Sequence, residues 1–316
     1  MRIFANPNYN FIKWRWHALL ASMVIIWAGV ASIYFKGGLP LGIDFSGGTA
    51  LIVQFNQATS EDVVRKALDP LATGIGVQRY GKPEQHALFV RMPMLHPDVQ
   101  GREIDADAKA AEAALRAANV GAFKITGQDI VGPIMGSDLR TKGILATLTA
   151  LGGISLYVWF RFRLVFAIGA LVATFHDILI TLVFLSWFHY EMSLIIIAAL
   201  LTITGYSVND TIVVFDRVRE NERNQRRLPL VELVNTSVNQ TLGRTIITSG
   251  VTFLAVLALF LFGGEVLHGF AFTMLIGVLT GTYSTVFIAA SLAIILSHTT
   301  PATGAAVPGA RAAAKR

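Results

Sequence analysis

The chain has 316 residues, of which 53% are hydrophobic and only 15% are charged, and its mean hydropathy is +0.57. Soluble domains usually carry about a quarter charged residues, so this composition excludes an ordinary soluble protein and indicates a membrane protein. Cysteine is absent, which excludes disulfides, thiolate metal sites and cysteine nucleophiles, and the net charge of +6 is distributed in a way that argues against a nucleic-acid partner.

Six stretches are apolar for long enough to cross a bilayer, which takes about 20 residues. They lie at 17–35, 143–160, 164–187, 193–215, 245–262 and 270–296. The first stretch follows basic residues, as a signal peptide does. Its apolar core is longer than the roughly 7–15 residues of a signal, however, and no A-x-A cleavage site follows it. We therefore expect a retained membrane anchor.

The polar segment between the first two spans has the pattern of a small α+β domain. Residues 41–55, LGIDFSGGTALIVQF, predict a long strand with a bulge at the Gly-Gly pair. A short helix capped by Ser60, two strands around a Gly-Lys-Pro turn, an Ala-rich helix at 104–119 and a strand at 122–131 follow. The order βαββαβ is the split-βαβ, ferredoxin-like pattern. This fold by itself names no function.

No enzyme active site, cofactor site or metal site is evident in the sequence. The carboxylates and histidines of the polar segment have no ligand or nucleophile–base spacing and are interpreted as solvated surface groups: Asp44, His86, His96, Asp105 and Asp107. The chain also lacks a phosphate-binding G-x-x-x-x-G-K-[ST] loop, an H-E-x-x-H motif and a dinucleotide fingerprint. Any work would therefore draw its energy from a partner or an ion gradient.

Basic residues are distributed unevenly about the spans. Those of the N-terminal arm, the 161–163 and 217–244 loops and the tail all fall on one side of a six-span topology, and the short loops opposite contain none. This positive-inside pattern predicts cytoplasmic termini, an external polar segment, and basic residues in contact with anionic lipid. The expected parts are an arm with the first span at 1–36, an external α+β domain at 37–142, a five-span region at 143–296 and a disordered tail at 297–316.

Two carboxylates fall inside predicted spans, Asp177 next to His176, and Asp210. A charge at the centre of a membrane helix costs roughly 2.5–3.5 kcal/mol on insertion scales, and such residues commonly mark proton or ion routes. For Asp177 we favour hydrogen bonding between helices, and for His176 a satisfied interior histidine. In the sixth span, Gly277 and Gly281 form a GxxxG pattern that predicts close helix packing.

Asp210 has polar neighbours on the same predicted helix. Tyr206 and Ser207 share its helical face, and Asn209 flanks it. Arg244, at the mouth of the next span, is the candidate ionic partner. Desolvation favours the neutral form of a carboxyl group and a nearby arginine favours the ionised form, so a movement of Arg244 relative to Asp210 would drive proton uptake and release. A fixed salt bridge or simple hydrogen bonding between helices is the alternative.

Five stretches together carry a resemblance: GIDFSGGT, FHDILITL, GYSVNDTIVVFDRVREN, NQTLGRTIITSGVTFLAVLALFLFGG and GFAFTMLIGVLTGTYSTVFIA. Over about 11–296 the chain resembles the SecD/SecF family of protein-export membrane proteins, on its SecF side. The resemblance implies half of an RND-superfamily transporter in the bacterial inner membrane, with cytoplasmic termini and a periplasmic loop. It also implies pairing with SecD in a twelve-helix bundle, association with the SecYEG channel, YajC and YidC, and export of unfolded polypeptides assisted by the proton-motive force.

The resemblance also implies functional residues. The family's essential intramembrane carboxylate corresponds to Asp210 in VNDT, and its functional arginine to Arg244 in TLGRT. With Asn209 and Asp177 these residues form the expected proton relay, and the external domain becomes a contact surface for partners or the emerging chain. The alternatives are an RND-type small-molecule efflux transporter and a scaffold whose polar residues are only structural. Efflux chains of that type typically carry twelve spans and two large external loops, whereas this chain has six spans and one loop.

Overall fold

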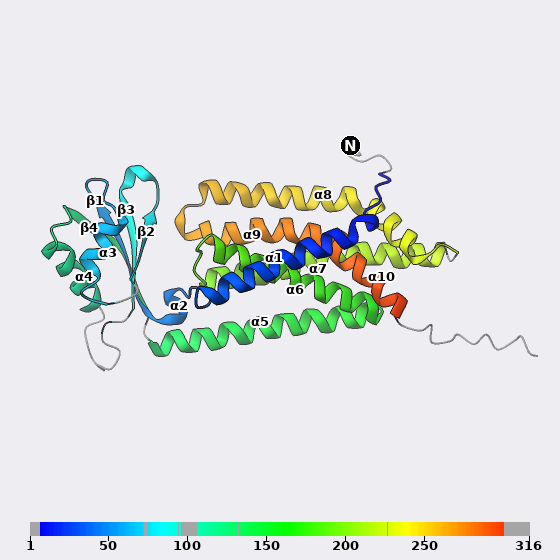
Figure 1. Ribbon diagram of the computed structural model, residues 1–316, viewed down its shortest axis with the longest axis horizontal. Helices are drawn as coiled ribbons and strands as arrows, with labels where there is room; N and C mark the ends of the chain where they lie inside the picture. Colours follow the sequence, from blue (N-terminus) through cyan, green and yellow to red (C-terminus); the bar gives the residue numbers. More distant parts are fainter. Residues whose placement is uncertain are drawn as a thin grey trace, which may run out of the picture.

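The computed structural model describes residues 7–72, 75–93, 95, 106–131, 133–225 and 227–299. It consists of a small sheet domain joined to one end of a long helical bundle (Figure 1). The start of α1, the connection between α7 and α8, and α10 lie at the opposite end of the bundle. His96, Asp105 and residues 300–316 of the expected tail lie outside the described residues.

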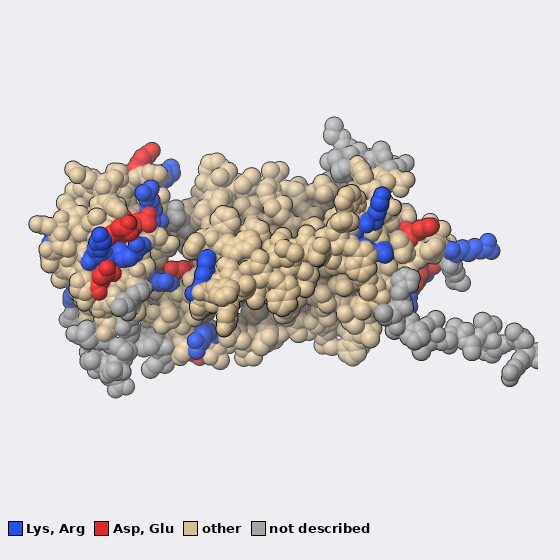
Figure 2. All heavy atoms as spheres, viewed as in Figure 1, with Lys and Arg blue, Asp and Glu red and all other residues tan. Residues whose placement is uncertain are grey.

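The bundle contains six helices in the described part of the chain that are long and apolar enough to span a membrane, which confirms the expected number. They are α1 (Arg15–Phe35), α5 (Pro133–Arg161), α6 (Leu164–Trp187), α7 (Leu194–Asn224), α8 (Leu230–Phe262) and α9 (Glu265–Ser284), and α9 continues through the π-helical η3 (Thr285–Ala289) into α10 (Ala290–Thr299). On the face drawn in Figure 2, charged residues gather over the sheet domain and at the two ends of the bundle, and the middle is free of them. Such an uncharged middle suits the hydrocarbon layer of a bilayer.

Helices α6, α7 and α9 form the interior of the bundle, whereas α1, α5 and α8 expose most of their apolar residues. The GxxxG pattern explains how α9 approaches α7. A Cβ added at Gly277 would lie 2.2 Å from Cδ1 of Ile203, and one added at Gly281 would lie 3.1 Å from Cβ of Ser207. The predicted close packing at these two glycines is therefore confirmed.

The expected polar loop at 217–244 is mostly helical. Helix α7 continues to Asn224 and α8 begins at Leu230, because polar contacts join the two helices beyond the apolar region. Asn221 donates to Oγ of Ser237 at 2.8 Å. Asn239, expected in a loop, lies on α8 and donates to the carbonyl of Tyr9 at 2.8 Å, so it holds the N-terminal arm against this helix.

The sheet domain has the predicted βαββαβ order. Its elements are β1 (Gly48–Phe55), α3 (Glu61–Leu68), β2 (Gly76–Tyr80), η2 (Pro83–Gln85), β3 (Ala87–Met92), α4 (Ala106–Ala117) and β4 (Phe123–Val131). All pairs are antiparallel in the order β2-β3-β1-β4. Alternate residues of the central strands, such as Leu51, Val53 and Val90, are fully buried and pack with Val64 of α3 and Leu115 of α4. This confirms the ferredoxin-like assignment.

The predicted long strand at 41–55 is wrong in its first half. A single helical turn, α2 (Ile43–Ser46), precedes the strand, and the Gly-Gly pair ends this turn. Gly47 has φ 71° and Gly48 has φ 133°, conformations that L side chains rarely adopt. A Cβ at Gly48 would also lie 2.3 Å from the carbonyl oxygen of Met92. The glycines therefore allow a sharp entry into β1, and the irregularity in β1 falls between Ile52 and Val53.

Candidate functional site

Asp210 lies in the interior of the bundle and is 4% exposed. It follows the start of α7 by a distance of about 24 Å along the helix axis. Its Oδ2 accepts a hydrogen bond from Oγ of Ser249 on α8 at 3.2 Å. That same Oγ accepts from the hydroxyl of Tyr206 at 3.2 Å and from Oγ1 of Thr282 on α9 at 2.8 Å. Three helices thus place a cluster of hydroxyl groups on one carboxyl group, and each hydroxyl can both donate and accept a proton.

Arg244 lies five residues before Ser249 on α8, and its side chain is exposed. The ion pairs among the described residues do not include one between Arg244 and Asp210. Arg244 instead lines an open cleft of about 450 Å³ between α7 and α8, together with polar residues that include Arg217, Glu220 and Gln240. The two expected members of the site are therefore on neighbouring helices but do not form an ion pair in this conformation.

Asn209 is exposed on the outer surface of α7, although the adjacent Asp210 is buried. Thr202 and Gly205 are exposed at helical spacing on the same face. Neither Asn209 nor Arg244 forms a side-chain hydrogen bond or ion pair with another residue in the part of the chain that the structure describes. The bundle therefore leaves an amide and a guanidinium uncovered on adjacent helices.

Asp177 occupies a second polar cluster and is 1% exposed. Its Oδ2 accepts from Oγ of Ser207 on α7 at 2.5 Å and from Oγ of Ser284 on α9 at 2.7 Å. Its Oδ1 lies 3.0 Å from Nδ1 of His176. These contacts join α6, α7 and α9, and Ser207 lies one turn before Asp210 on α7. The two carboxyl clusters are therefore adjacent along one helix.

His176 is buried, but only one of its ring nitrogens has a partner. Nε2 has no hydrogen-bond partner among the described residues, and the ring lies 6.2 Å from that of Tyr283, measured between centroids. The expectation of a satisfied interior histidine is therefore only half met. Thr282 and Ser284 were not identified from the sequence, because isolated Ser and Thr residues in an apolar span gain meaning only when the neighbouring helix is known.

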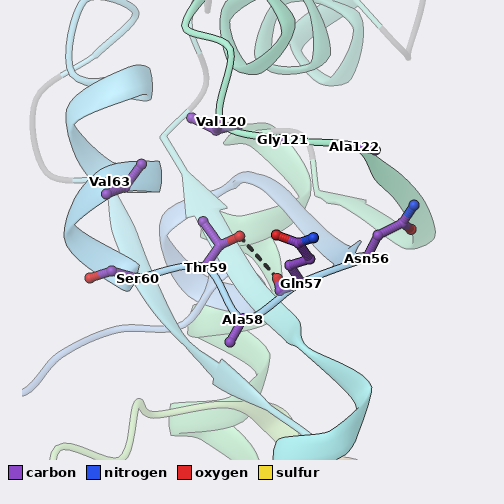
Figure 3. Close-up of a pocket in the computed structure, with 9 residues that line it drawn as sticks. All are labelled: Asn56, Gln57, Ala58, Thr59, Ser60, Val63, Val120, Gly121 and Ala122. Atoms are coloured by element: carbon purple, nitrogen blue, oxygen red, sulfur yellow. Dashed lines mark hydrogen bonds between the residues drawn. The ribbon is translucent and has the colours of Figure 1, made fainter.

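The sheet domain has an open hollow of about 480 Å³ lined by residues 56–60, Val63 and residues 120–122 (Figure 3). Its side chains are amides, hydroxyls and small apolar groups, and Oγ1 of Thr59 donates to the carbonyl of Gln57 at 3.2 Å. The lining contains no carboxylate, imidazole, amine or thiol that could activate its hydroxyl groups. The chemistry of the described part of the chain is therefore concentrated at the buried carboxyl groups of the bundle.

The chain is similar to known proteins over most of its length. Residues 110–299 match the family model "Protein export membrane protein SecD/SecF, C-terminal", and residues 35–59 match "SecD/SecF GG Motif". The chain is 41% identical over 303 residues to the protein translocase subunit SecF of Rhodothermus marinus, covering 94% of this chain and 96% of that protein. The corresponding values for SecF of Escherichia coli O157:H7 are 39% over 296 residues, with 91% and 88% covered.

Among solved structures, the crystal structure of SecDF, a translocon-associated membrane protein from a Thermus species, superposes with a TM-score of 0.81 at 33% identity. The match covers 93% of this chain and 39% of the SecDF chain. A second SecDF structure, in a super-membrane-facing form, gives a TM-score of 0.67. From the two family models and the near full-length similarity, the chain belongs to the SecD/SecF family of protein export membrane proteins.

Proposed function

We propose that this chain is a SecF-type subunit of a protein translocase, which uses the proton-motive force to assist polypeptide export across the bacterial inner membrane. The observation that carries the proposal is Asp210, a carboxyl group buried in a membrane-spanning helix, hydrogen-bonded to a hydroxyl cluster and unpaired with the arginine on the next helix. A permanently charged structural acid would be expected to hold its counter-ion at contact distance.

The proposed cycle follows from the separation of Asp210 and Arg244. Moving the guanidinium toward the carboxyl group releases the proton, because a nearby cation favours the ionised form, and moving it away allows reprotonation. Ser249, Tyr206 and Thr282 supply hydroxyls through which the proton can reach the carboxyl group. One charge crossing 100 mV is worth roughly 2.3 kcal/mol, which is enough to bias a two-state conformational change.

Asp177 is the second carboxyl group of the proposed relay and acts as its anchor. Its hydrogen bonds from Ser207 and Ser284 fix α7 and α9 against α6 directly beside the Asp210 cluster. Asn209, in contrast to the two carboxyl groups, lies outside the buried polar clusters. Because its amide is exposed on the outer face of α7, it belongs to a contact with another membrane chain.

A SecD-type subunit is the proposed occupant of that outer face. Uncovered polar groups are costly in lipid, and both Asn209 and Arg244 are uncovered on adjacent helices. The similarity to 39% of a SecDF chain supports a partner that supplies further spans. The SecYEG channel, YajC, YidC and the exported polypeptide are the remaining partners that we propose, with the sheet domain in the periplasm and both termini in the cytoplasm. The relatives reported above are protein translocase subunits, so no observation favours a drug-efflux function.

The experiment is translocation of a precursor into membrane vesicles that contain the chain, its SecD-type partner and the translocase, with and without a proton gradient. Asp210→Asn preserves shape but cannot titrate, so the stimulation by the gradient should fall to the level of vesicles that lack the chain. Glu222→Gln, on the same helix and in an exposed ion pair with Arg163, is the matched control and should keep the stimulation. Full stimulation by Asp210→Asn at normal protein levels would refute the proposal.

A further inference from the structure

Residues 40–48, here called the clamp, connect the sheet domain to the start of α7 through backbone hydrogen bonds. The backbone N–H of Gly42 donates to the carbonyl of Met192 at 2.7 Å, and that of Met192 donates to the carbonyl of Pro40 at 2.7 Å. Leu41 and Met192 form a parallel β-bridge. A Cβ at Gly42 would lie 2.9 Å from the carbonyl oxygen of Met192, so this approach needs a glycine. The chain segment that leads into the sheet is thus hydrogen-bonded to the loop before α7.

Asp44 of the clamp caps α7. Its Oδ2 accepts a hydrogen bond from the backbone N–H of Leu194, the first residue of α7, at 2.9 Å. Ser193, the N-cap, accepts from the N–H of Ile196 at 3.3 Å. The first N–H groups of a helix lack partners within the helix, and a negative charge there is stabilised by the helix dipole. The interpretation of Asp44 as a solvated surface group misses this role, because the partly exposed carboxylate also accepts from the first turn of α7.

Arg91 connects the sheet to the clamp and to the loop before α7. It lies on β3, and one guanidinium nitrogen contacts both the carbonyl of Leu41 and Oε2 of Glu191, each at 2.6 Å. Glu191 belongs to the loop before α7, and both side chains of the pair are largely buried, at 21% and 23% exposed. Burial raises the pKa of Glu191, and the charge of Arg91 opposes that rise. A partly desolvated ion pair is sensitive to geometry, so it holds β3 and this loop in one arrangement.

The clamp also packs closely against α5. Gly47 lies against α5, where a Cβ at Gly136 would come within 3.0 Å of its backbone nitrogen. The next residue, Gly48, is the first of β1, which pairs with both β3 and β4. Strands β1 and β3 are therefore both connected to the start of α7, through the clamp and through the Arg91–Glu191 pair.

We infer that the clamp, together with Arg91 and Glu191, is a rigid joint that transmits movement of α7 to the sheet domain. This inference rests on the proposed function, because the movement that it transmits is the one driven by the proton at Asp210. Asp44 and Arg91 are positioning residues in this joint, with no part in proton transfer. The pull on an exported chain would then be delivered by the sheet domain as α7 moves.

The first test compares two variants of Asp44 in the full chain with its partner in vesicles. Asp44→Asn retains an oxygen that can accept from Leu194, whereas Asp44→Ala removes this acceptor and leaves the N-cap Ser193 in place. Gradient-stimulated translocation should fall about fivefold in Asp44→Ala, the size of one lost capping hydrogen bond, and stay within about twofold of wild type in Asp44→Asn. Equal activity of the two variants would overturn the inference.

The second readout is proton uptake into the same vesicles, followed with a pH-sensitive dye. Uncoupling predicts that Asp44→Ala and Arg91→Ala keep proton uptake while translocation falls, an outcome that a misfolded bundle cannot give. Loss of both activities in Asp44→Ala would mean that the clamp only supports folding, and would overturn the joint. The proposed function fails separately, if Asp210→Asn keeps translocation at the wild-type level.

A disulfide tests the rigidity directly, since the chain has no cysteine of its own. Leu41→Cys and Met192→Cys place the two thiols on β-bridge partners, a spacing that suits a disulfide. A rigid joint remains closed through the cycle, so the oxidised double variant should cross-link in high yield and keep at least half of its translocation activity. Inhibition on oxidation that reductant reverses would show that the clamp opens, which contradicts the inference.

Discussion

The hydroxyl of Ser249 lies 3.2 Å from the buried carboxylate of Asp210, so the acid on α7 is held by the same helix that carries Arg244. A shift of α8 along α7 would therefore change the hydrogen bond from Ser249 and the distance from Arg244 to the acid together. The hydroxyl and the guanidinium belong to one moving element, and each can be tested separately.

Ser249→Ala removes the hydrogen-bond donor to Asp210 and should lower gradient-stimulated translocation about fivefold, because a buried acceptor then loses its partner. Ser249→Thr retains the hydroxyl and should remain close to wild type. Ser155→Ala on α5 is the matched control, since its hydroxyl only returns to the carbonyl of Leu151. A Ser249→Ala variant as active as the control would remove Ser249 from the site.

Arg244→Lys should reduce stimulated translocation about tenfold, the effect of losing roughly one charge-assisted hydrogen bond. A guanidinium presents a planar fork to a carboxylate, and an ammonium presents a point charge. Translocation rates with and without the gradient provide the measurement. Normal rates in Arg244→Lys would mean that only positive charge matters at this position.

Asp177→Asn should keep most of the stimulated translocation, because the amide oxygen can still accept from Ser207 and Ser284. Asp177→Ala leaves both hydroxyls without that acceptor and should lower the thermal unfolding temperature in detergent by several degrees, consistent with a loss of about 1–2 kcal/mol. If Asp177→Asn behaves as Asp210→Asn does, Asp177 exchanges protons and is more than an anchor.

Glu191 should give the attachment of the sheet domain a defined pH dependence. Because its pKa is raised above the ordinary 4.5 in the folded protein, the folded state binds more protons than the unfolded state between these two values. The free energy of unfolding should therefore fall as pH rises from about 4.5 to the raised pKa and stay level above it. Unfolding followed across this range should lose that slope in Glu191→Gln.

Arg91→Ala should extend the pH range of this effect, whereas Glu191→Gln should abolish the effect. Removing the opposing charge raises the pKa of Glu191 further, so the fall in unfolding free energy should extend to higher pH. The same measurement applies to this variant. A pH profile that is identical in Arg91→Ala and wild type would show that the pair is not coupled.

Asn209→Trp should prevent co-purification with the SecD-type partner, because a large side chain on the outer face of α7 would separate the two chains. Leu156→Trp on α5, at another exposed position, is the control and should leave the complex intact. If the complex co-purifies with Asn209→Trp but not with Leu156→Trp, the partner contacts α5 and not α7.

The six helices and the βαββαβ order were predictable because they depend on local pattern, namely long apolar runs and alternating strands. The helical turn before β1 was not, since a Gly-Gly pair fits a strand bulge as well as a sharp turn. The hydroxyl cluster required the packing of three helices, so Thr282 gained its role only through contact with Ser249. The π-helical segment at Thr285–Ala289 has no sequence signal that we can identify.

The lengths of α7 between Leu194 and Asp210 and of β1 determine how far a rotation of α7 displaces the sheet domain. If α7 pivots at Leu194 by about 10°, Asp210 travels roughly 4 Å, the range over which an ion pair forms or breaks. Through the joint the same angle reappears in β1, whose eight residues extend about 27 Å. A swing of a few ångströms deep in the bilayer would thus become a stroke of about 5 Å at the far edge of the sheet.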